Sequence, residues 1–140
     1  MTPLPLRLHP DQDLRLALQE VLAHHDVTAA YVLQGIGSLK LAQLRFAGAP
    51  AATELRGDLE ILSLAGSLSV DGAHLHMAIA DAQGRVSGGH VAAGCIVRTT
   101  AELLLVLLPE YQFTREQDMV STFAELSIRN SIGVTGATGK

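Results

Sequence analysis

Apolar and polar residues alternate along several short stretches of the chain, which is the period of a strand with one buried face. The clearest alternation spans 58–70, where apolar residues occupy one parity and serines occupy the other. Asp71-Gly72 follows as a strong turn signal, and the alternation resumes over 74–80. The pattern therefore predicts two strands joined by a tight turn. The residues on the apolar parity of the first strand are Leu62, Leu64, Leu68 and Val70.

One early segment has helical rather than strand spacing. Asp11 and Asp13 precede it and suit the N-terminal end of a helix, because the helix dipole stabilises a carboxylate there. His24 and His25 close its last turn, and we expect them to be structural or solvent-exposed rather than metal ligands. Its single apolar stripe consists of Leu14, Leu18, Val21 and Leu22.

Shorter patterns predict the remaining strands. Gly35-Ile36-Gly37-Ser38 breaks or bulges the chain after 27–33, and we expect a returning strand over 40–46. The stretch 102–108 is apolar on both faces, so it should be central in a sheet or lie at a subunit contact. Further strands are expected at 3–9, 86–91, 95–100 and 124–128.

The C-terminal third has weaker signals. Thr114 with Gln117 predicts the start of a short capped helix. The segment 131–140 consists mostly of Gly, Ser, Thr and Ala without a pattern, so we expect a flexible tail there. The chain shows no internal repeat, and we expect one domain over 1–130.

The composition sets the class of protein. With 140 residues, 48% of them hydrophobic and 17% charged, the chain can bury one core and is not of the disordered class. So low a charged fraction leaves apolar surface on a small domain, and we therefore expect a homo-oligomer. The net charge is −4, and three basic residues never fall within five positions. The chain thus lacks the basic footprint of a lone DNA-binding domain or of a membrane-surface protein.

Cysteine usage and hydropathy indicate a cytoplasmic location. The N-terminus has no basic region followed by an apolar run, so we expect no signal peptide. The longest strongly apolar run, 103–109, is far shorter than the ~20 residues of a membrane helix. Cys95 is the single cysteine and cannot form an internal disulfide. We expect it to be a small buried hydrophobic residue rather than a nucleophile.

Three histidines form the most specific chemical pattern. His74 and His76 leave the same face of their strand, close enough to share one metal ion. His90 comes opposite His76 if the following hairpin has a three-residue loop, Ala82-Gln83-Gly84. A two-residue loop would turn His90 to the other face, unless a bulge at Gly88-Gly89 restored the parity.

Three imidazoles on a sheet are a plausible shell for Zn²⁺ or a similar ion and leave one position open for water or substrate. The spacing equally permits polar-face histidines that bond to each other and to water. Asp81 is expected to serve its own turn, and Glu60 to be an exposed strand end. No Ser-His-Asp or Cys-His nucleophile pattern occurs, and the glycines lack a dinucleotide fingerprint. The carboxylates considered as acid-base or outer-shell partners are Asp71, Asp81, Glu60 and Glu102.

Four motifs follow one another at 35–39, 57–67, 71–76 and 81–90. This ordered run resembles the PPC domain, the plant and prokaryote conserved domain also called DUF296, over about residues 4–128. The resemblance is to the free-standing prokaryotic type. It implies an α/β fold of the α+β type, with a largely antiparallel mixed sheet and one main N-terminal helix, usually assembled as a homotrimer.

The resemblance also implies a function. Carried over to this chain, the metal ligands fall on His74, His76 and His90, and we expect a divalent transition metal, zinc first. Plant members hold DNA with an Arg-Gly-Arg-Pro hook, which this chain lacks, so a DNA or protein partner is implied by the family but not supported by the charge. We therefore expect a homotrimeric metal-binding module with a binding or regulatory role. The alternative is a metal-dependent enzyme that uses the open position to activate water or bind a small ligand.

Overall fold

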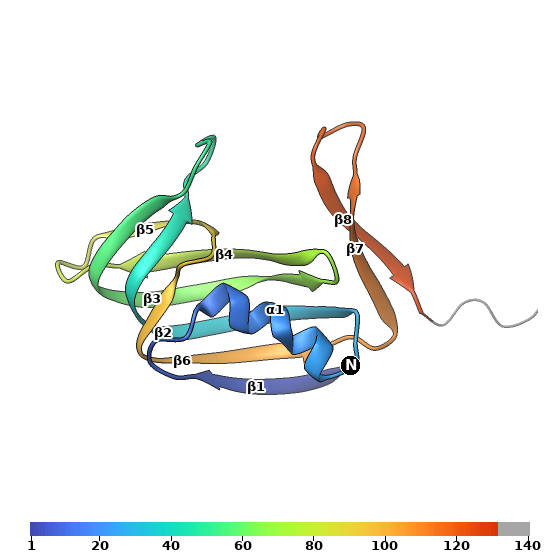
Figure 1. Ribbon diagram of the computed structural model, residues 1–140, viewed down its shortest axis with the longest axis horizontal. Coiled ribbons are helices and arrows are strands. Elements are labelled where there is room, and N and C mark those ends of the chain that lie inside the picture. Colours follow the sequence, from blue (N-terminus) through green and yellow to red (C-terminus); the bar gives the residue numbers. More distant parts are fainter. Residues whose placement is uncertain (132–140) are drawn as a thin grey trace, which may run out of the picture.

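The computed structural model describes residues 1–131, which form eight strands and one helix (Figure 1). The expected tail over 131–140 lies, apart from its first residue, outside the described residues. In the described part, no helix has the length and apolar character of a membrane span. In chain order the elements are β1 (Thr2–Leu8), α1 (Leu14–His24), β2 (Ala29–Arg45), β3 (Thr53–Ser69), β4 (Gly72–Ala80), β5 (Val86–Val91), β6 (Ile96–Leu107), β7 (Tyr111–Gln117) and β8 (Ala124–Asn130).

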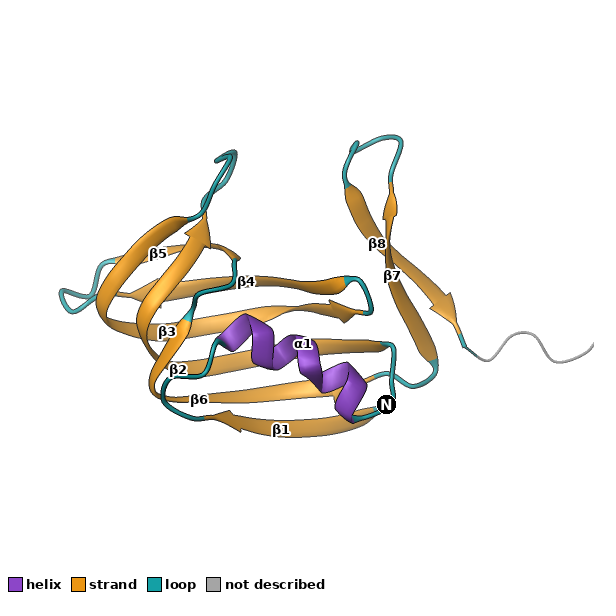
Figure 2. Ribbon diagram, viewed as in Figure 1, coloured by secondary structure: helices purple, strands orange, loops and turns teal. Residues whose placement is uncertain are grey.

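Six strands form one antiparallel sheet in the order β1-β6-β2-β3-β4-β5. The long strands β2 and β3 curl at one end, where Leu44 and Arg45 of β2 pair with Val91 and His90 of β5. The sheet therefore closes on itself at this end, while α1 lies across one of its faces (Figure 2). The expected α+β class, a largely antiparallel sheet with one main helix in a single compact domain, is confirmed.

Helix α1 begins and packs as its sequence predicts. The Asp13 carboxylate caps it by accepting hydrogen bonds from the backbone N–H groups of Arg15 and Leu16, at 3.0 and 3.1 Å. Asp11 lies before the helix and pairs with the Lys40 side chain instead. The four residues of the predicted apolar stripe are all buried: Leu14, Leu18, Val21 and Leu22.

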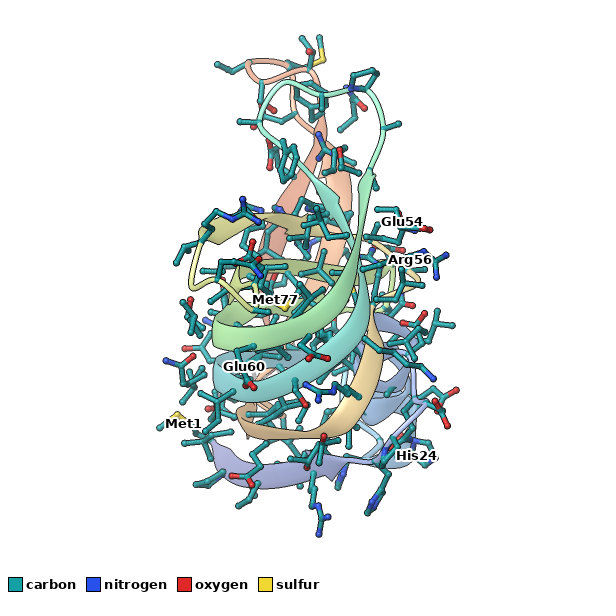
Figure 3. The ribbon with its side chains drawn as sticks, turned by 90° about the vertical axis from the view of Figure 1, so that its left-hand side faces the viewer. Met1, His24, Glu54, Arg56, Glu60 and Met77 are labelled. Carbon is teal, nitrogen blue, oxygen red and sulfur yellow. The ribbon has the colours of Figure 1, made fainter. Side chains whose placement is uncertain are left out.

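The two histidines at the end of α1 are exposed, as expected. The Nδ1 atom of His24 lies 2.7 Å from the carbonyl oxygen of Glu20, one turn earlier in the helix. Figure 3 shows His24 at the outer surface of the molecule. His24 and His25 are therefore helix-end residues, and neither belongs to the group of histidines on the sheet.

Strand β2 runs unbroken, so the expectation of a separate returning strand over 40–46 is wrong. Its ladders with β3 and β6 shift register around Leu39 but resume on both sides. The glycine-rich segment therefore bulges inside a doubly paired strand instead of ending it. The two strands expected at 95–100 and 102–108 also form one strand, β6, because Ala101 pairs with both Leu8 and Gly37. β6 lies between β1 and β2, which confirms its central position.

Strand β3 departs from its predicted alternation at Leu62, whose side chain is 47% exposed. The register with β4 shifts between Ile61 and Ser63, and the extra residue reverses the parity of the strand. Ile61 is therefore buried before the bulge and Leu64 after it. Val70 is exposed because it lies in the turn that follows β3. On the parity expected to be wetter, Ser67 and Ser69 are buried.

The short helix expected from Thr114 and Gln117 is wrong, because both residues lie in strand β7. β7 pairs with β8, which confirms the strand expected at 124–128, and the two form a separate hairpin at one end of the sheet (Figure 1). Phe113 joins this hairpin to the main sheet by packing edge-to-face against Tyr31 of β2, with ring centroids 5.7 Å apart. The tertiary contact of an aromatic residue thus overrides a weak capping signal.

Candidate functional site

The β4–β5 hairpin has the three-residue loop that the histidine pattern requires. The backbone N–H of Asp81 donates to the carbonyl of Arg85 at 2.9 Å, and Gly84 takes the left-handed conformation with φ of 76°. The Asp81 carboxylate accepts from the backbone N–H groups of Gln83 and Arg85, which lowers its pKa. Asp81 therefore serves its own turn, as expected.

This loop sets His76 directly opposite His90 across the β4–β5 ladder. The ladder continues without a register shift through Gly88 and Gly89, so no bulge is needed to restore parity. Gly89 lies where β5 meets the end of β2, and a Cβ atom there would come 2.6 Å from the carbonyl oxygen of Arg45. Glycine thus allows the close approach of the two strands that closes the sheet beside His90.

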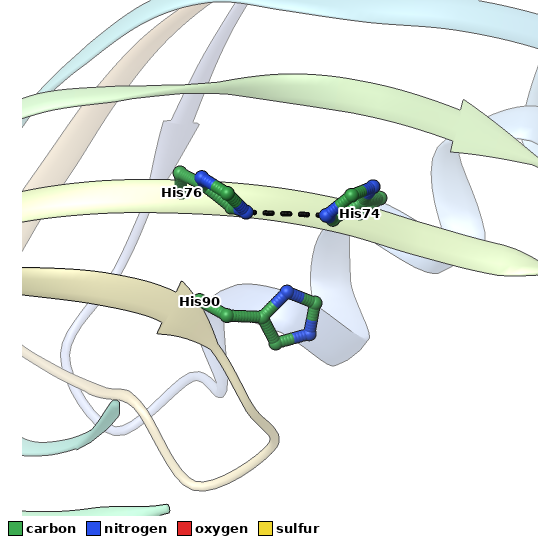
Figure 4. Close-up of side chains that lie close together, drawn as sticks. All are labelled: His74, His76 and His90. Carbon is green, nitrogen blue, oxygen red and sulfur yellow. Dashed lines mark hydrogen bonds between the residues drawn. The ribbon is translucent and has the colours of Figure 1, made fainter. Parts of the chain in front are cut away.

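The structure brings the three predicted histidines into one cluster (Figure 4). The Nε2 atoms of His74 and His76 are 3.1 Å apart, and each histidine offers a nitrogen within 4.8 Å of the others. Adjacent ligand nitrogens of a tetrahedral zinc ion lie ~3.4 Å apart, given zinc–nitrogen bonds of about 2.0–2.1 Å. The His74–His76 pair is therefore close to that spacing, and the same short contact also fits a hydrogen bond between two neutral imidazoles.

Two properties of His90 bear on metal binding. Its Nδ1 atom is buried and has no hydrogen-bond partner among the described residues. A buried nitrogen without a partner is unfavourable, whereas a metal ion satisfies it. Burial, followed by the charges of His74, Arg15, Arg45 and His76, lowers the pKa of His90 to about 4. The ring is thus neutral at pH 7, which is the form that binds metals.

A pocket of about 480 Å³ opens beside His74 and His90. Three arginines line it, Arg15 from α1, Arg45 from β2 and Arg115 from β7. Burial and then the charge of Arg115 lower the pKa of His74 as well. Sequence reasoning missed these arginines because they lie far apart along the chain, and the closure of the sheet and the β7–β8 hairpin bring them together.

Of the four carboxylates considered from the sequence, Asp71 lines this pocket. It accepts a hydrogen bond from the backbone N–H of Arg115 at 2.7 Å. Glu125, which the sequence did not suggest, lines it from β8. Glu60 is exposed on β3, as Figure 3 shows, and Glu102 borders a different groove, on β6. Neither therefore reaches the histidine cluster.

Cys95 is buried, as expected, and lies away from the histidines. Its sulfur accepts from the backbone N–H of Gln43 at 3.3 Å. Burial raises the pKa of the thiol, which disfavours the thiolate that a nucleophile requires. Cys95 is thus a core residue.

Comparison with known proteins adds a family to this geometry. The model of the Plants and Prokaryotes Conserved (PCC) domain matches residues 1–109. A curated relative, the bifunctional protein GlmU of Synechococcus sp. (strain JA-2-3B'a(2-13)), is 44% identical over 129 residues, which are 92% of this chain and 20% of that protein. The chain spans about a fifth of the length of the curated relatives it matches.

Solved structures share the fold over nearly the whole chain. A hypothetical protein from Salmonella cholerae-suis is 38% identical with a TM-score of 0.90, covering 94% of this chain and 95% of that one. A metal-containing protein from Archaeoglobus fulgidus is 26% identical with a TM-score of 0.75, covering 89% and 92%. A proposed DNA-binding protein from Bacteroides thetaiotaomicron, 17% identical with a TM-score of 0.78 and 91% coverage of each chain, shows the fold alone.

Proposed function

The chain belongs to the Plants and Prokaryotes Conserved domain family, and on that premise we propose that it is a homotrimeric module that binds a divalent transition metal. The ligands are His74, His76 and His90, and zinc is the first metal to expect, because three neutral imidazoles are a common zinc shell. The role is one of binding or regulation. The observation that carries the proposal is the buried Nδ1 atom of His90, which has no hydrogen-bond partner in the described part of the chain, within a cluster of three imidazoles.

The alternative function, a metal-dependent enzyme that uses the open position to activate water or bind a small ligand, needs a free base beside the metal if it is to activate water. Asp71 and Glu125 line the adjoining pocket, but Asp71 already accepts a hydrogen bond from Arg115. The same pocket is rich in arginine, which favours binding of an anion over activation of water. These features support a binding role more than a hydrolytic one.

Metal analysis of the purified protein tests the proposed ligands. We expect about one equivalent of zinc per chain in the native protein and less than a tenth of that in His76→Ala and His90→Ala. His24→Ala is the matched control, because His24 is exposed on α1 and lies outside the cluster. Equal metal content in all four proteins would refute the site.

The proposed trimer is supported by apolar side chains that the single chain leaves uncovered. They lie on three neighbouring strands, β2, β3 and β6, and a solvent-facing group of this kind is typical of a subunit contact. Each is 42–54% exposed in the isolated chain. The four residues are Leu33, Ile36, Leu62 and Leu104.

Sedimentation equilibrium tests the assembly. For a chain of 14.8 kDa we expect a particle of about three times that mass. Ile36→Asp and Leu104→Asp should shift it toward the monomer, because each places a charge on the proposed contact. Val86→Asp changes an apolar residue on β5 that is more exposed than either, and it should leave the mass unchanged. A monomeric native protein would disprove the trimer.

A further inference from the structure

Three arginines converge on the pocket beside the histidines, and none of them forms an ion pair with a carboxylate among residues 1–131. Arg15, Arg45 and Arg115 all line the pocket. The ion pairs found among residues 1–131 use other cations, and none includes these three arginines. Unpaired guanidinium groups gathered in a partly buried place are costly unless an anion joins them.

Two of the three guanidinium groups are held in place by the fold. Nη1 of Arg15 donates to the carbonyl of Val91 at 2.8 Å, and Nη2 of Arg115 donates to the Ser67 hydroxyl at 2.8 Å. Each guanidinium has five N–H donors, so these bonds leave most of the donors free for a ligand. The arginines are therefore preorganised donors rather than loose surface side chains.

The rest of the pocket suits a small molecule. Its volume of about 480 Å³ falls within the range of small-molecule sites. Ala73 and Phe123 give it an apolar part. Its acidic groups are Asp71, already bonded to the backbone N–H of Arg115, and Glu125. With three arginines against two carboxylates, and a metal ion proposed beside them, the lining favours an anionic ligand.

We propose that this pocket binds a small metabolite through a carboxylate or phosphate group held by Arg15, Arg45 and Arg115. Planar guanidinium groups recognise both kinds of oxyanion through paired hydrogen bonds. The site adjoins His74 and His90, so the anion lies next to the proposed metal centre. The anion site depends on the three arginines and not on the metal. It adds to the proposed function the class of ligand that the module binds.

Isothermal titration calorimetry on metal-free protein, freed of chelator by dialysis, tests the anion site separately from the metal. Inorganic phosphate and malonate serve as the two probes. We expect at least one of them to bind, and the one that binds more tightly identifies the anionic group. Failure of both to bind at millimolar concentration would overturn the proposal.

Variants then locate the site. We expect Arg45→Gln and Arg115→Gln to weaken binding about tenfold each, the loss of a hydrogen bond to a charged group. Arg98→Gln removes the same charge from an exposed site on β6 and should change the affinity less than twofold. If Arg45→Gln and Arg98→Gln weakened anion binding equally, the effect would come from the overall charge of the protein and the proposal would be overturned.

The same variants separate this inference from the metal centre. Arg45 forms no side-chain hydrogen bond within residues 1–131, so Arg45→Gln should fold normally and retain the native zinc content. His90→Ala should lose zinc while its metal-free form still binds the anion. If the metal-free protein binds the anion and the native protein holds no zinc, the anion site stands and the metal proposal fails. If the native protein holds zinc and the metal-free protein does not bind the anion, only the anion site is ruled out.

Discussion

At the scale of single residues, half-buried His90 combines a buried Nδ1 atom, which has no hydrogen-bond partner among residues 1–131, with a strongly lowered pKa. Each property follows from its place at the point where β5 meets the end of β2. A neutral imidazole is the form that a metal binds, so these surroundings keep His90 in the form that the proposed metal site requires. The lowered pKa of His90 costs folding free energy at acidic pH when no metal is bound.

That cost gives a pH prediction for the metal-free protein. The unfolded chain protonates His90 near pH 6.5, whereas the folded chain resists protonation until about pH 4. The unfolded state therefore binds more protons between these values, and stability falls as the pH is lowered from about 6.5 to about 4.

Urea titrations of chelator-treated protein at pH 7 and pH 5 measure this effect. We expect the drop in unfolding free energy to be smaller in His90→Gln than in the native protein, because glutamine does not titrate. An equal drop in both proteins would show that His90 is not the responsible group.

At the scale of elements, the β4–β5 hairpin and the end of β2 form the frame of the site. The three-residue loop fixes the register that sets His76 against His90. The closing contact between β5 and β2 then carries Arg45 to the edge of the pocket. The frame depends on close backbone approach, which makes it sensitive to any added side chain.

Gly89→Ala tests this frame. Its Cβ would lie 2.6 Å from the carbonyl oxygen of Arg45, so we expect β5 and β2 to separate and the protein to lose roughly 1–3 kcal/mol, as for overpacking. Ser87→Ala, on the same strand, should lie within ±0.5 kcal/mol of the native protein. Thermal unfolding of both variants measures the difference, and equal midpoints would contradict the role given to Gly89.

At the scale of the whole molecule, three of the ten lysines and arginines gather in one pocket. Arg15, Arg45 and Arg115 meet there, while the chain as a whole carries a net charge of −4. A duplex needs basic side chains along an extended surface, because its phosphates are neutralised in rows. A concave cluster of three arginines suits a small anion better than a duplex.

A mobility-shift titration examines the consequence for DNA. At ~150 mM salt we expect no shift of a 30-base-pair duplex by micromolar native protein, since few phosphates could be neutralised at once. A salt-sensitive shift that disappears in Arg45→Gln would contradict this expectation and make the arginine cluster a DNA contact.

Local pattern by itself determined the features that depend on near neighbours. The spacing of Leu14 and Leu18 with the Asp13 cap predicted α1, and strand parity placed His74 and His76 on one face. The sequence placed His90 opposite His76 only on the condition of a three-residue hairpin loop, because hairpin register follows from loop length, and the structure decided that length. The family resemblance was also visible in the ordered motifs.

Features that depend on distant parts of the chain were decided by the tertiary structure. Bulges in β2 and β3 changed strand boundaries and exposed Leu62, because the pairing of neighbouring strands determines where a ladder resumes. β7 formed a strand instead of a helix because β8 and Tyr31 supplied its partners. The arginine pocket joins three segments separated by 30 or more residues. Local periodicity carries no information about residues so far apart in the sequence. The closure of the sheet is what brings them together.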